Sequence, residues 1–249
     1  SKLIPILRAN RTADFFKFEY LSRGLTFPQV TLPFSYFSYL CLMDYLEALQ
    51  KRYSVKKFDP SKEVSSQILQ NILQAGKLSA SSLGLQPYKI LVVESKEMLE
   101  KLFPAFHNAS QISSCSKLIV IVSKKTVDRS YIDGYFRHIS EVREIPVENL
   151  SPFRRNIESY TESNVDVQAW ADKQSYIVLG SLIFAAAMEE VDSCPMEGFK
   201  KDLIEEILGL DTEKESVAVT LALGYRSEDD DFQRLKKVRK PDEKLFKFI

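Results

Sequence analysis

Residues Tyr176–Met188 (YIVLGSLIFAAAM) form the longest apolar stretch of the chain. Together with the more polar residues before them, they predict one long helix over 165–191. Because this stretch is apolar nearly all the way round, we expect the helix to lie in a core or at a subunit interface. It is well short of the ~20 residues that a membrane-spanning helix requires, so we predict no membrane partner.

Three shorter runs, on either side of this helix in the sequence, predict strands. YKILVV at 88–93 and KLIVIV at 117–122 are β-rich and of the buried-strand type. VAVTLAL at 217–223 is a further strand. These runs indicate a central sheet.

Apolar residues at helical spacing predict helices that cover this sheet. One spans 64–73 with Ser65 as its N-cap, and another spans 203–208 and ends at Gly209. The polar residues of 126–163 predict surface helices and connections. The sum is an α+β fold.

The first 42 residues differ from the rest. Val30–Leu42 is rich in aromatic residues and has no helical or strand period. A fresh start follows, because Asp44 and Glu47 have the spacing of a capping box. We therefore predict an N-terminal extension of unknown role over 1–42 and a domain over 43–249.

Composition narrows the class of protein. The chain of 249 residues carries 34 Lys and Arg against 34 Asp and Glu, and this neutral balance argues against a nucleic-acid partner. Its three cysteines are an odd number and form no Cys-x-x-Cys pair, which favours a reducing, cytoplasmic location.

Several common cofactor and catalytic motifs do not occur. The sequence has no Gly-x-Gly of a Rossmann fingerprint, no P-loop and no Gly-x-Ser-x-Gly elbow. Its two histidines, His107 and His138, do not match zinc spacing, and we predict no metal site. Any dinucleotide must therefore bind without the usual glycine loop, or the chemistry uses another cofactor.

Four local patterns remain. RYSVKKF at 52–58 could hold a phosphate with its cations and hydroxyl, or could be a solvated charge cluster at a helix C-terminus. Residues 79–88 (SASSLGLQPY) form a loop that a planar ligand or phosphate could approach, or an ordinary connection. Residues 192–199 (DSCPMEGF) offer exposed backbone amides, or a plain turn between helices. KKVRKP at 236–241 could be a nuclear-localisation or nucleic-acid patch, but the acidic run Glu228–Asp231 before it weakens that interpretation and favours a solvated loop.

In this order and spacing, the patterns resemble the FMN-dependent NAD(P)H nitroreductase family, nearest the oxygen-insensitive nitroreductase and dihydropteridine reductase branch. The resemblance covers about 43–249. The matching blocks are RYSVKKFDPSK, LSASSLGLQPYKILVV, DSCPMEGF, ALGYRSEDD and KKVRKP.

The resemblance implies the nitroreductase fold, with a mixed sheet of mainly antiparallel type flanked by helices, in an intertwined homodimer. It implies FMN at each of two subunit interfaces, and NADH or NADPH as electron donor. A hydride would pass through flavin N5 to a small-molecule acceptor such as a nitroaromatic or a quinone, in ping-pong order. The alternatives are a flavin reductase, an ene or dehalogenating reductase of the same superfamily, and a flavin-binding protein without turnover.

The resemblance also assigns cofactor-binding roles to particular residues. It places Arg52, Ser54 and Lys56 at the FMN phosphate and the pyrimidine edge of the flavin, with Lys237 and Arg239 at the phosphate. It places Ser81 and Ser82 on a loop lent by the second subunit, Asn108 at the isoalloxazine, and Glu197 and Gly198 at flavin N5. Tyr53, Gly84 and Pro195 belong to the same segments. No side chain is assigned as a general acid.

Four positions depart from the family pattern. Gly84 stands where Asn is frequent, so the resemblance implies a missing polar contact to the flavin or its ribityl chain. Gln111 stands where Lys is common, which bears on NAD(P)H affinity and nicotinamide preference. Tyr53 replaces a frequent His and Tyr88 a frequent Trp, and neither swap removes a charge that the flavin needs.

Overall fold

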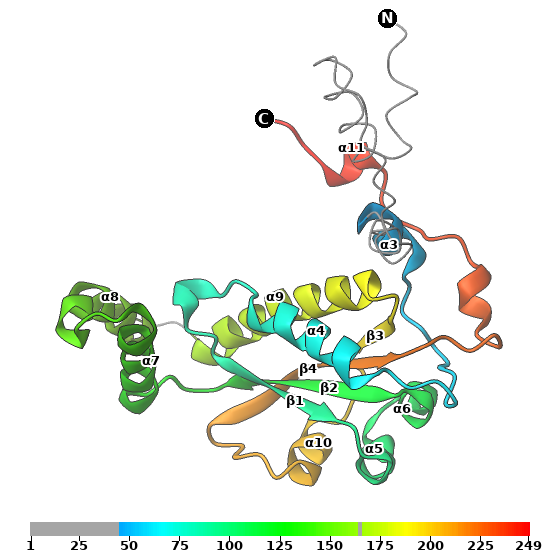
Figure 1. Ribbon diagram of the computed structural model, residues 1–249, viewed down its shortest axis with the longest axis horizontal. Helices are drawn as coiled ribbons and strands as arrows, with labels where there is room; N and C mark the ends of the chain where they lie inside the picture. The colour runs from blue at the N-terminus through cyan, green and yellow to red at the C-terminus, as the bar shows by residue number, and fades with distance from the viewer. Residues whose placement is uncertain (1–44, 164–165) are drawn as a thin grey trace, which may run out of the picture. The chain divides into compact units, whose positions relative to one another are not determined.

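The computed structural model describes residues 45–163 and 166–249, and a four-stranded sheet lies at the centre of this part (Figure 1). Its strands are β1 (Tyr88–Val93), β2 (Lys117–Lys124), β3 (Asp192–Met196) and β4 (Glu215–Gly224), in the order β1-β2-β4-β3. All three neighbouring pairs are antiparallel. The strands predicted over 88–93, 117–122 and 217–223 are confirmed, as is the α+β class.

The sheet is buried on both faces. Successive side chains of a strand point to opposite faces. Along β2, Leu118, Val120 and Val122 therefore enter one apolar cluster, while Ile119 and Ile121 enter another. This explains why the sequence of β2 is a continuous apolar run.

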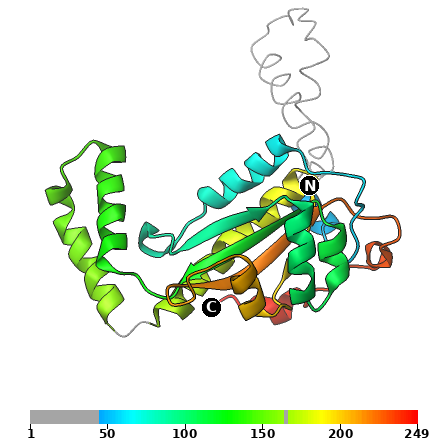
Figure 2. The same ribbon diagram turned by 90° about the horizontal axis from the view of Figure 1, so that it is seen from below.

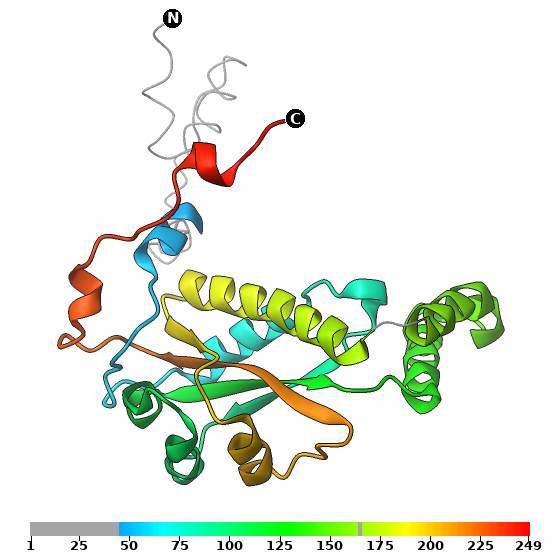
Figure 3. The ribbon, with the colours of Figure 1, turned by 180° about the vertical axis from the view of Figure 1, so that it is seen from behind.

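Two helices, α9 (Val167–Met188) and α4 (Ser66–Lys77), cover one face (Figures 1 and 3). Ser65 Oγ accepts the Ile68 N–H at 3.3 Å, which confirms the predicted N-cap. The long helix predicted over 165–191 is confirmed as α9, but it ends at Met188, three residues earlier than predicted, and Val165 lies outside the described residues.

The other face is covered by α5 (Lys96–Leu102), α6 (Ala109–Ser114) and α10 (Lys201–Ile207) (Figures 1 and 2). As predicted, α10 ends beside Gly209. This glycine has a φ of +64° and donates its N–H to the Glu206 carbonyl at 3.1 Å. A positive φ is the conformation in which glycine commonly ends helices.

Helices α7 (Arg129–Arg143) and α8 (Ser151–Glu162) pack on each other beside these layers (Figures 1 and 2). Their apolar cluster contains Phe136 and Ile157, both fully buried, and joins Trp170 of α9. The helices predicted within 126–163 are confirmed.

Short elements complete the described part of the chain. Helix α3 (Tyr45–Lys51) begins it and helix α11 (Asp242–Leu245) lies near its end. Single turns of 3₁₀ helix lie at 82–84, 103–105, 147–150 and 231–234. The capping box that begins at Asp44 lies outside the described residues, and the domain boundary near residue 43 stays a prediction.

Strand β3 corrects the interpretation of 192–199 as a possible turn between helices. Asp, Ser and Pro are turn residues, and they hide the strand in the sequence. Its residues nevertheless pair with β4 from Asp192, opposite Gly224, to Met196, opposite Thr220. Pro195 is tolerated because β3 is the edge of the sheet, where a missing N–H costs no ladder bond.

Candidate functional site

The segment that follows α3 runs along the outer edge of β3. A parallel bridge joins Ser54 to Ser193, and Val55 donates its N–H to the Ser193 carbonyl at 3.4 Å. Val55 and Phe58 are fully buried and anchor the segment in the core.

The C-terminal segment meets this edge from far along the chain. Lys237 Nζ donates to the carbonyls of Leu49 and Arg52, at the end of α3. The two segments line a pocket of about 560 Å³. Its lining is Gln50, Lys51, Arg52, Tyr53, Ser54, Lys56, Phe232, Gln233, Leu235, Lys236, Lys237 and Arg239. We name it the cationic pocket, because Lys and Arg dominate this lining and it includes no Asp or Glu.

Two donors in the cationic pocket lack partners. Arg52 Nε and Nη2 are buried and make no hydrogen bond within the described residues. Burial lowers the pKa of the Arg52 guanidinium, and the charge of Arg239 lowers it further. Burial likewise lowers the pKa of Lys237, and the charges of Arg52 and Arg239 add to the effect.

These features fit a bound phosphate. A buried donor without a partner costs roughly 1–3 kcal/mol, and an anion would remove that cost. Arg can bind a phosphate through two parallel N–H bonds, while Lys serves as a point charge. The cationic pocket therefore has the donor set and the charge that a phosphate requires. The interpretation of 236–241 as a solvated loop is wrong for Lys237, whose ammonium is held by two carbonyls.

A second group of predicted residues, Asn108, Glu197 and Gly198, lies close to the residues of the cationic pocket. Ser110 Oγ is 2.9 Å from the Lys56 carbonyl and 2.9 Å from Asn108 Oδ1, so it connects these two segments. His107 donates its N–H to the Gly198 carbonyl at 2.9 Å, which places Asn108 beside the 197–198 turn. Glu197 itself accepts a hydrogen bond from the hydroxyl of Tyr176 on α9.

Gln111 lies between the two groups. Its side chain is buried, and Nε2 is 3.4 Å from the Val55 carbonyl and 3.2 Å from Cys194 Sγ. Its Oε1 is buried and has no partner among the described residues. Burial raises the pKa of the Cys194 thiol, against the opposing effect of Lys56. Residues 52–56, 108–111 and 194–198 thus form one continuous region.

The structure does not bring Ser81, Ser82 and Gly84 into this region. Ser82 donates its N–H to Gln174 Oε1 at 2.7 Å, and Ser81 Oγ accepts the Gln86 N–H at 3.0 Å. Their loop leads into Tyr88, which pairs with Ser123 near the end of β2.

The cationic pocket lies at the other end of the sheet. Ser54 bridges to Ser193, which pairs with Leu223, and Leu223 pairs with Lys117 at the start of β2. Lys117 and Ser123 are six positions apart along β2, which is about 20 Å at the usual rise of a strand. Within one chain, the serine loop and the cationic pocket therefore lie at opposite ends of the sheet.

Sequence reasoning missed the side chains that support the site. Asp192 binds the Arg226 guanidinium at Nε with distances of 3.0 and 3.1 Å, and Arg226 lies over the Tyr53 ring at 4.6 Å. Asp230 is buried and accepts hydrogen bonds from the segment after Arg52. Asp230 lies within an acidic run, and nothing in the sequence separates it from its exposed neighbours.

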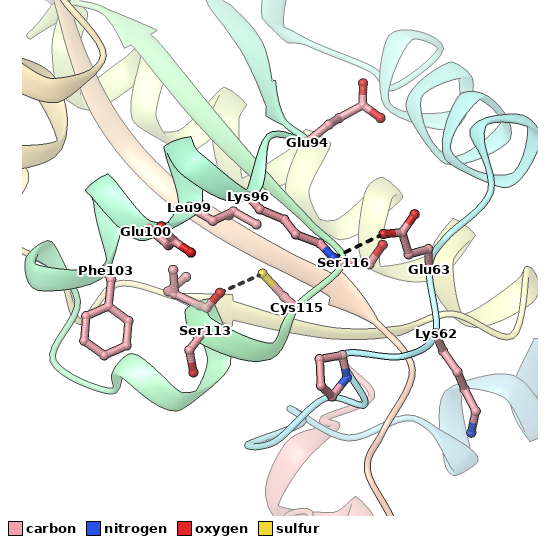
Figure 4. A pocket seen from close by; sticks show the side chains of 12 residues that line it. Lys62, Glu63, Glu94, Lys96, Leu99, Glu100, Phe103, Ser113, Cys115 and Ser116 are labelled. Carbon is pink, nitrogen blue, oxygen red and sulfur yellow. Dashed lines mark hydrogen bonds and ion pairs between the residues drawn. The ribbon is translucent and has the colours of Figure 1, made fainter.

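A different cavity, of about 460 Å³, lies between α5 and α6 (Figure 4). Leu99, Phe103 and Cys115 line it, and Lys96 and Glu63 form an ion pair at 3.9 Å. Burial raises the pKa of the Cys115 thiol to about 12, so this thiol stays protonated near neutral pH. None of the predicted site residues lines this cavity.

Within residues 45–163 and 166–249, no group of three or more His, Cys, Asp or Glu residues could hold a metal ion. None of the helices in these two ranges combines the length and the apolar character needed to cross a membrane.

Known proteins resemble this chain over most of its length. A model of the nitroreductase family matches residues 49–225. A protein of Staphylococcus haemolyticus named as a candidate NAD(P)H nitroreductase is 35% identical over 214 residues, covering 82% of this chain and 96% of its own length.

Solved structures share the fold. A candidate NAD(P)H:FMN oxidoreductase of Staphylococcus epidermidis superposes with a TM-score of 0.74 at 23% identity, over 83% of this chain and 96% of the other. A candidate nitroreductase of Exiguobacterium sibiricum, solved in complex with FMN, gives a TM-score of 0.72 at 22% identity, over 83% and 98% of the two chains. The family model, the relative in sequence and the shared fold agree with the resemblance of the five sequence blocks, and the chain belongs to the nitroreductase family.

Proposed function

We propose that this protein is an FMN-dependent oxidoreductase that takes electrons from NADH or NADPH and passes them to a small organic acceptor. The observation that carries the proposal is the cationic pocket, with its buried and unpartnered Arg52 donors. Support comes from the family, from the relative's name, which includes NAD(P)H, and from the solved neighbour that contains FMN.

In this proposal, the cationic pocket holds the phosphate of FMN. Arg52 and Arg239 bind the phosphate oxygens and Lys237 adds a point charge. The Ser54 hydroxyl, on the same edge, is a further donor. Tyr53 lines the pocket but turns its hydroxyl to Asp230 at 3.0 Å, so we assign it to the wall rather than to the phosphate.

Lys56, Asn108 and Gln111 would line the part of the site that holds the flavin ring. Lys56 lines the cationic pocket and its carbonyl is 2.9 Å from Ser110 Oγ, and its charge would stabilise negative charge on the pyrimidine edge. Pro195, Glu197 and Gly198 would present backbone groups to the central part of the ring. When bound, FMN supplies the hydride chemistry, taking two electrons from NAD(P)H and returning them to a nitroaromatic or quinone.

A second copy of the chain would complete each site. Ser81, Ser82 and Gly84 lie at the far end of the sheet from the cationic pocket of their own chain, so they can serve only a flavin held by a partner. Helix α9 also exposes apolar side chains, including Ile177 and Phe184, which lie on one stripe. We infer a homodimer in which this stripe is buried.

The test is direct. The purified protein should bind FMN stoichiometrically, with a yellow spectrum, and NADH or NADPH should bleach it under anaerobic conditions. A nitroaromatic or a quinone should then restore the colour. A protein that neither contains nor takes up FMN would overturn the proposal.

The same assay separates the alternatives. Turnover with free flavin alone would indicate a flavin reductase, and turnover only with activated alkenes or halogenated substrates would indicate an ene or dehalogenating reductase. Stopped-flow mixing that gives NADH binding without bleaching would indicate a flavin-binding protein without turnover.

A further inference from the structure

One buried carboxylate joins the two segments of the cationic pocket. Asp230 Oδ2 accepts the Lys56 N–H at 2.7 Å, the Lys57 N–H at 3.3 Å and the Tyr53 hydroxyl at 3.0 Å. Its other oxygen, Oδ1, accepts the Phe232 N–H at 3.1 Å. One side of the carboxylate thus holds the segment after α3, and the other side holds the start of the C-terminal segment.

The environment of Asp230 distinguishes it from its neighbours. The residue is 3% exposed, whereas Asp229 and Asp231 lie in solvent and form ion pairs with Lys57 and Arg234. Although burial opposes it, hydrogen bonds from Lys56, Phe232 and Tyr53 lower the pKa of Asp230, so it is ionised at neutral pH.

We propose that Asp230 is a positioning residue for phosphate recognition, which sets the cations of 52–56 opposite those of 237–239. The proposal rests on the proposed function in that the phosphate belongs to FMN. Asp230 does not itself line the cationic pocket, and it acts through the backbone of Lys56 and Phe232.

The substitution Asp230→Asn separates position from charge. Loss of a negative charge near the cations would by itself strengthen the binding of an anion. An amide, however, has only one acceptor oxygen and places an NH₂ group against N–H or O–H donors on one side. Weaker phosphate binding in D230N would therefore show that the cations of 52–56 and 237–239 are no longer held in place.

The experiment compares FMN with riboflavin, which has the same ring and no phosphate. We expect D230N to weaken FMN binding by at least about tenfold, the size expected for a lost charge-assisted hydrogen bond. Riboflavin affinity should fall by a clearly smaller factor than FMN affinity, because riboflavin meets Lys56 at the ring but lacks the phosphate that needs both sets of cations. Asp229→Asn is the matched control, since it removes an exposed carboxylate from the adjacent position, and its FMN affinity should match the wild type.

Two further measurements keep the proposal testable. If D230N does not fold, Tyr53→Phe replaces it, because this variant removes one donor and keeps the carboxylate. It should weaken FMN binding by a smaller factor than the tenfold expected for D230N. Direct calorimetric titration with inorganic pyrophosphate reports on the cationic pocket in the absence of FMN, and pyrophosphate affinity should fall in D230N. Equal losses for FMN and riboflavin, or a D230N protein that binds FMN as tightly as D229N, would overturn the proposal. A wild type that binds pyrophosphate but not FMN would overturn the proposed function alone.

Discussion

Arg52 carries the clearest consequence at the scale of single residues. Two of its nitrogens are buried without a partner among the described residues, and Arg239 repels it. Such an arrangement costs stability in the protein without cofactor and contributes affinity when an anion binds. Arg52 should therefore lower the stability of the FMN-free protein and raise the affinity for FMN.

We predict that Arg52→Met raises the free energy of unfolding of the FMN-free protein by about 1–2 kcal/mol and weakens FMN binding by about 1.5–3 kcal/mol. Methionine keeps much of the apolar stem and removes the unpartnered donors. Denaturant unfolding and fluorescence titration measure the two effects. Arg234→Met is the control, because Arg234 is exposed and forms an ion pair with Asp231 outside the site. A loss of stability in FMN-free R52M would contradict this interpretation.

The buried thiols allow a second prediction at this scale. Burial raises the pKa of Cys115 to about 12, which leaves about one thiolate in ten thousand at pH 8. Cys194 is also buried and its pKa is also raised. In a Cys41→Ser variant, we expect both thiols to resist Ellman's reagent in the native protein and to react rapidly in denaturant. Fast reaction of either thiol in the native protein would show that its site opens.

At the scale of elements, the packing of α4 against α9 depends on a glycine. A Cβ atom on Gly76 would lie 2.8 Å from Leu182 Cδ2, and Leu182 is itself fully buried in the core. We predict that Gly76→Ala lowers the free energy of unfolding by about 1–3 kcal/mol through overpacking.

Gly134→Ala is the matched control for this substitution. Gly134 lies within α7, and a Cβ atom there would have no neighbour within 4 Å. Alanine is the better helix former, so this variant should gain up to about 1 kcal/mol. Thermal or urea denaturation of both variants compares them directly, and equal effects would rule out the contact with Leu182.

The elements that the sequence predicted are those whose own residues determine them. The apolar runs of β1 and β2 and the Ser65 cap of α4 are local signals. Strand β3 is different, because residues such as Pro195 have low strand propensity and only the pairing with β4 makes a strand of them. No local pattern contains that information.

The residues of the candidate site also differ in whether the sequence predicts them. The cations of 52–56 and 237–239 were predicted to belong to the site through the resemblance, since each cluster alone is more typical of a solvated surface. Asp230 was not found, because its burial results from contacts with residues about 174 positions away. Residues that touch a ligand leave a pattern in the sequence, whereas residues that hold them in place often do not.

For the whole molecule, the proposed homodimer would make assembly part of function, because the serine loop and the cationic pocket of one chain lie at opposite ends of the sheet. We predict that Ile177→Glu weakens dimerisation by at least about 100-fold, because it places a charge in the apolar stripe of α9. FMN content should fall in parallel, since each flavin would lose Ser81 and Ser82 of the partner. Analytical ultracentrifugation and the visible spectrum measure the two effects.

Phe103→Glu is the control for this prediction. Phe103 is 41% exposed, close to the 47% of Ile177, but it follows α5 on the opposite side of the sheet. This variant should remain a dimer and keep its FMN. An I177E protein that is monomeric and yet binds FMN as the wild type does would show that one chain suffices.

The contact of Lys237 with Arg52 also has a consequence for protein synthesis. These residues are 185 positions apart, so the pocket between them cannot exist until the chain has left the ribosome as far as Lys237. All four strands are complete by Gly224, and a chain that stops soon afterwards contains the sheet without the last cations. In the proposed function, cofactor retention would then distinguish chains that extend past Arg239 from chains interrupted soon after Gly224, and the colour of a preparation would report the fraction that contains the complete pocket.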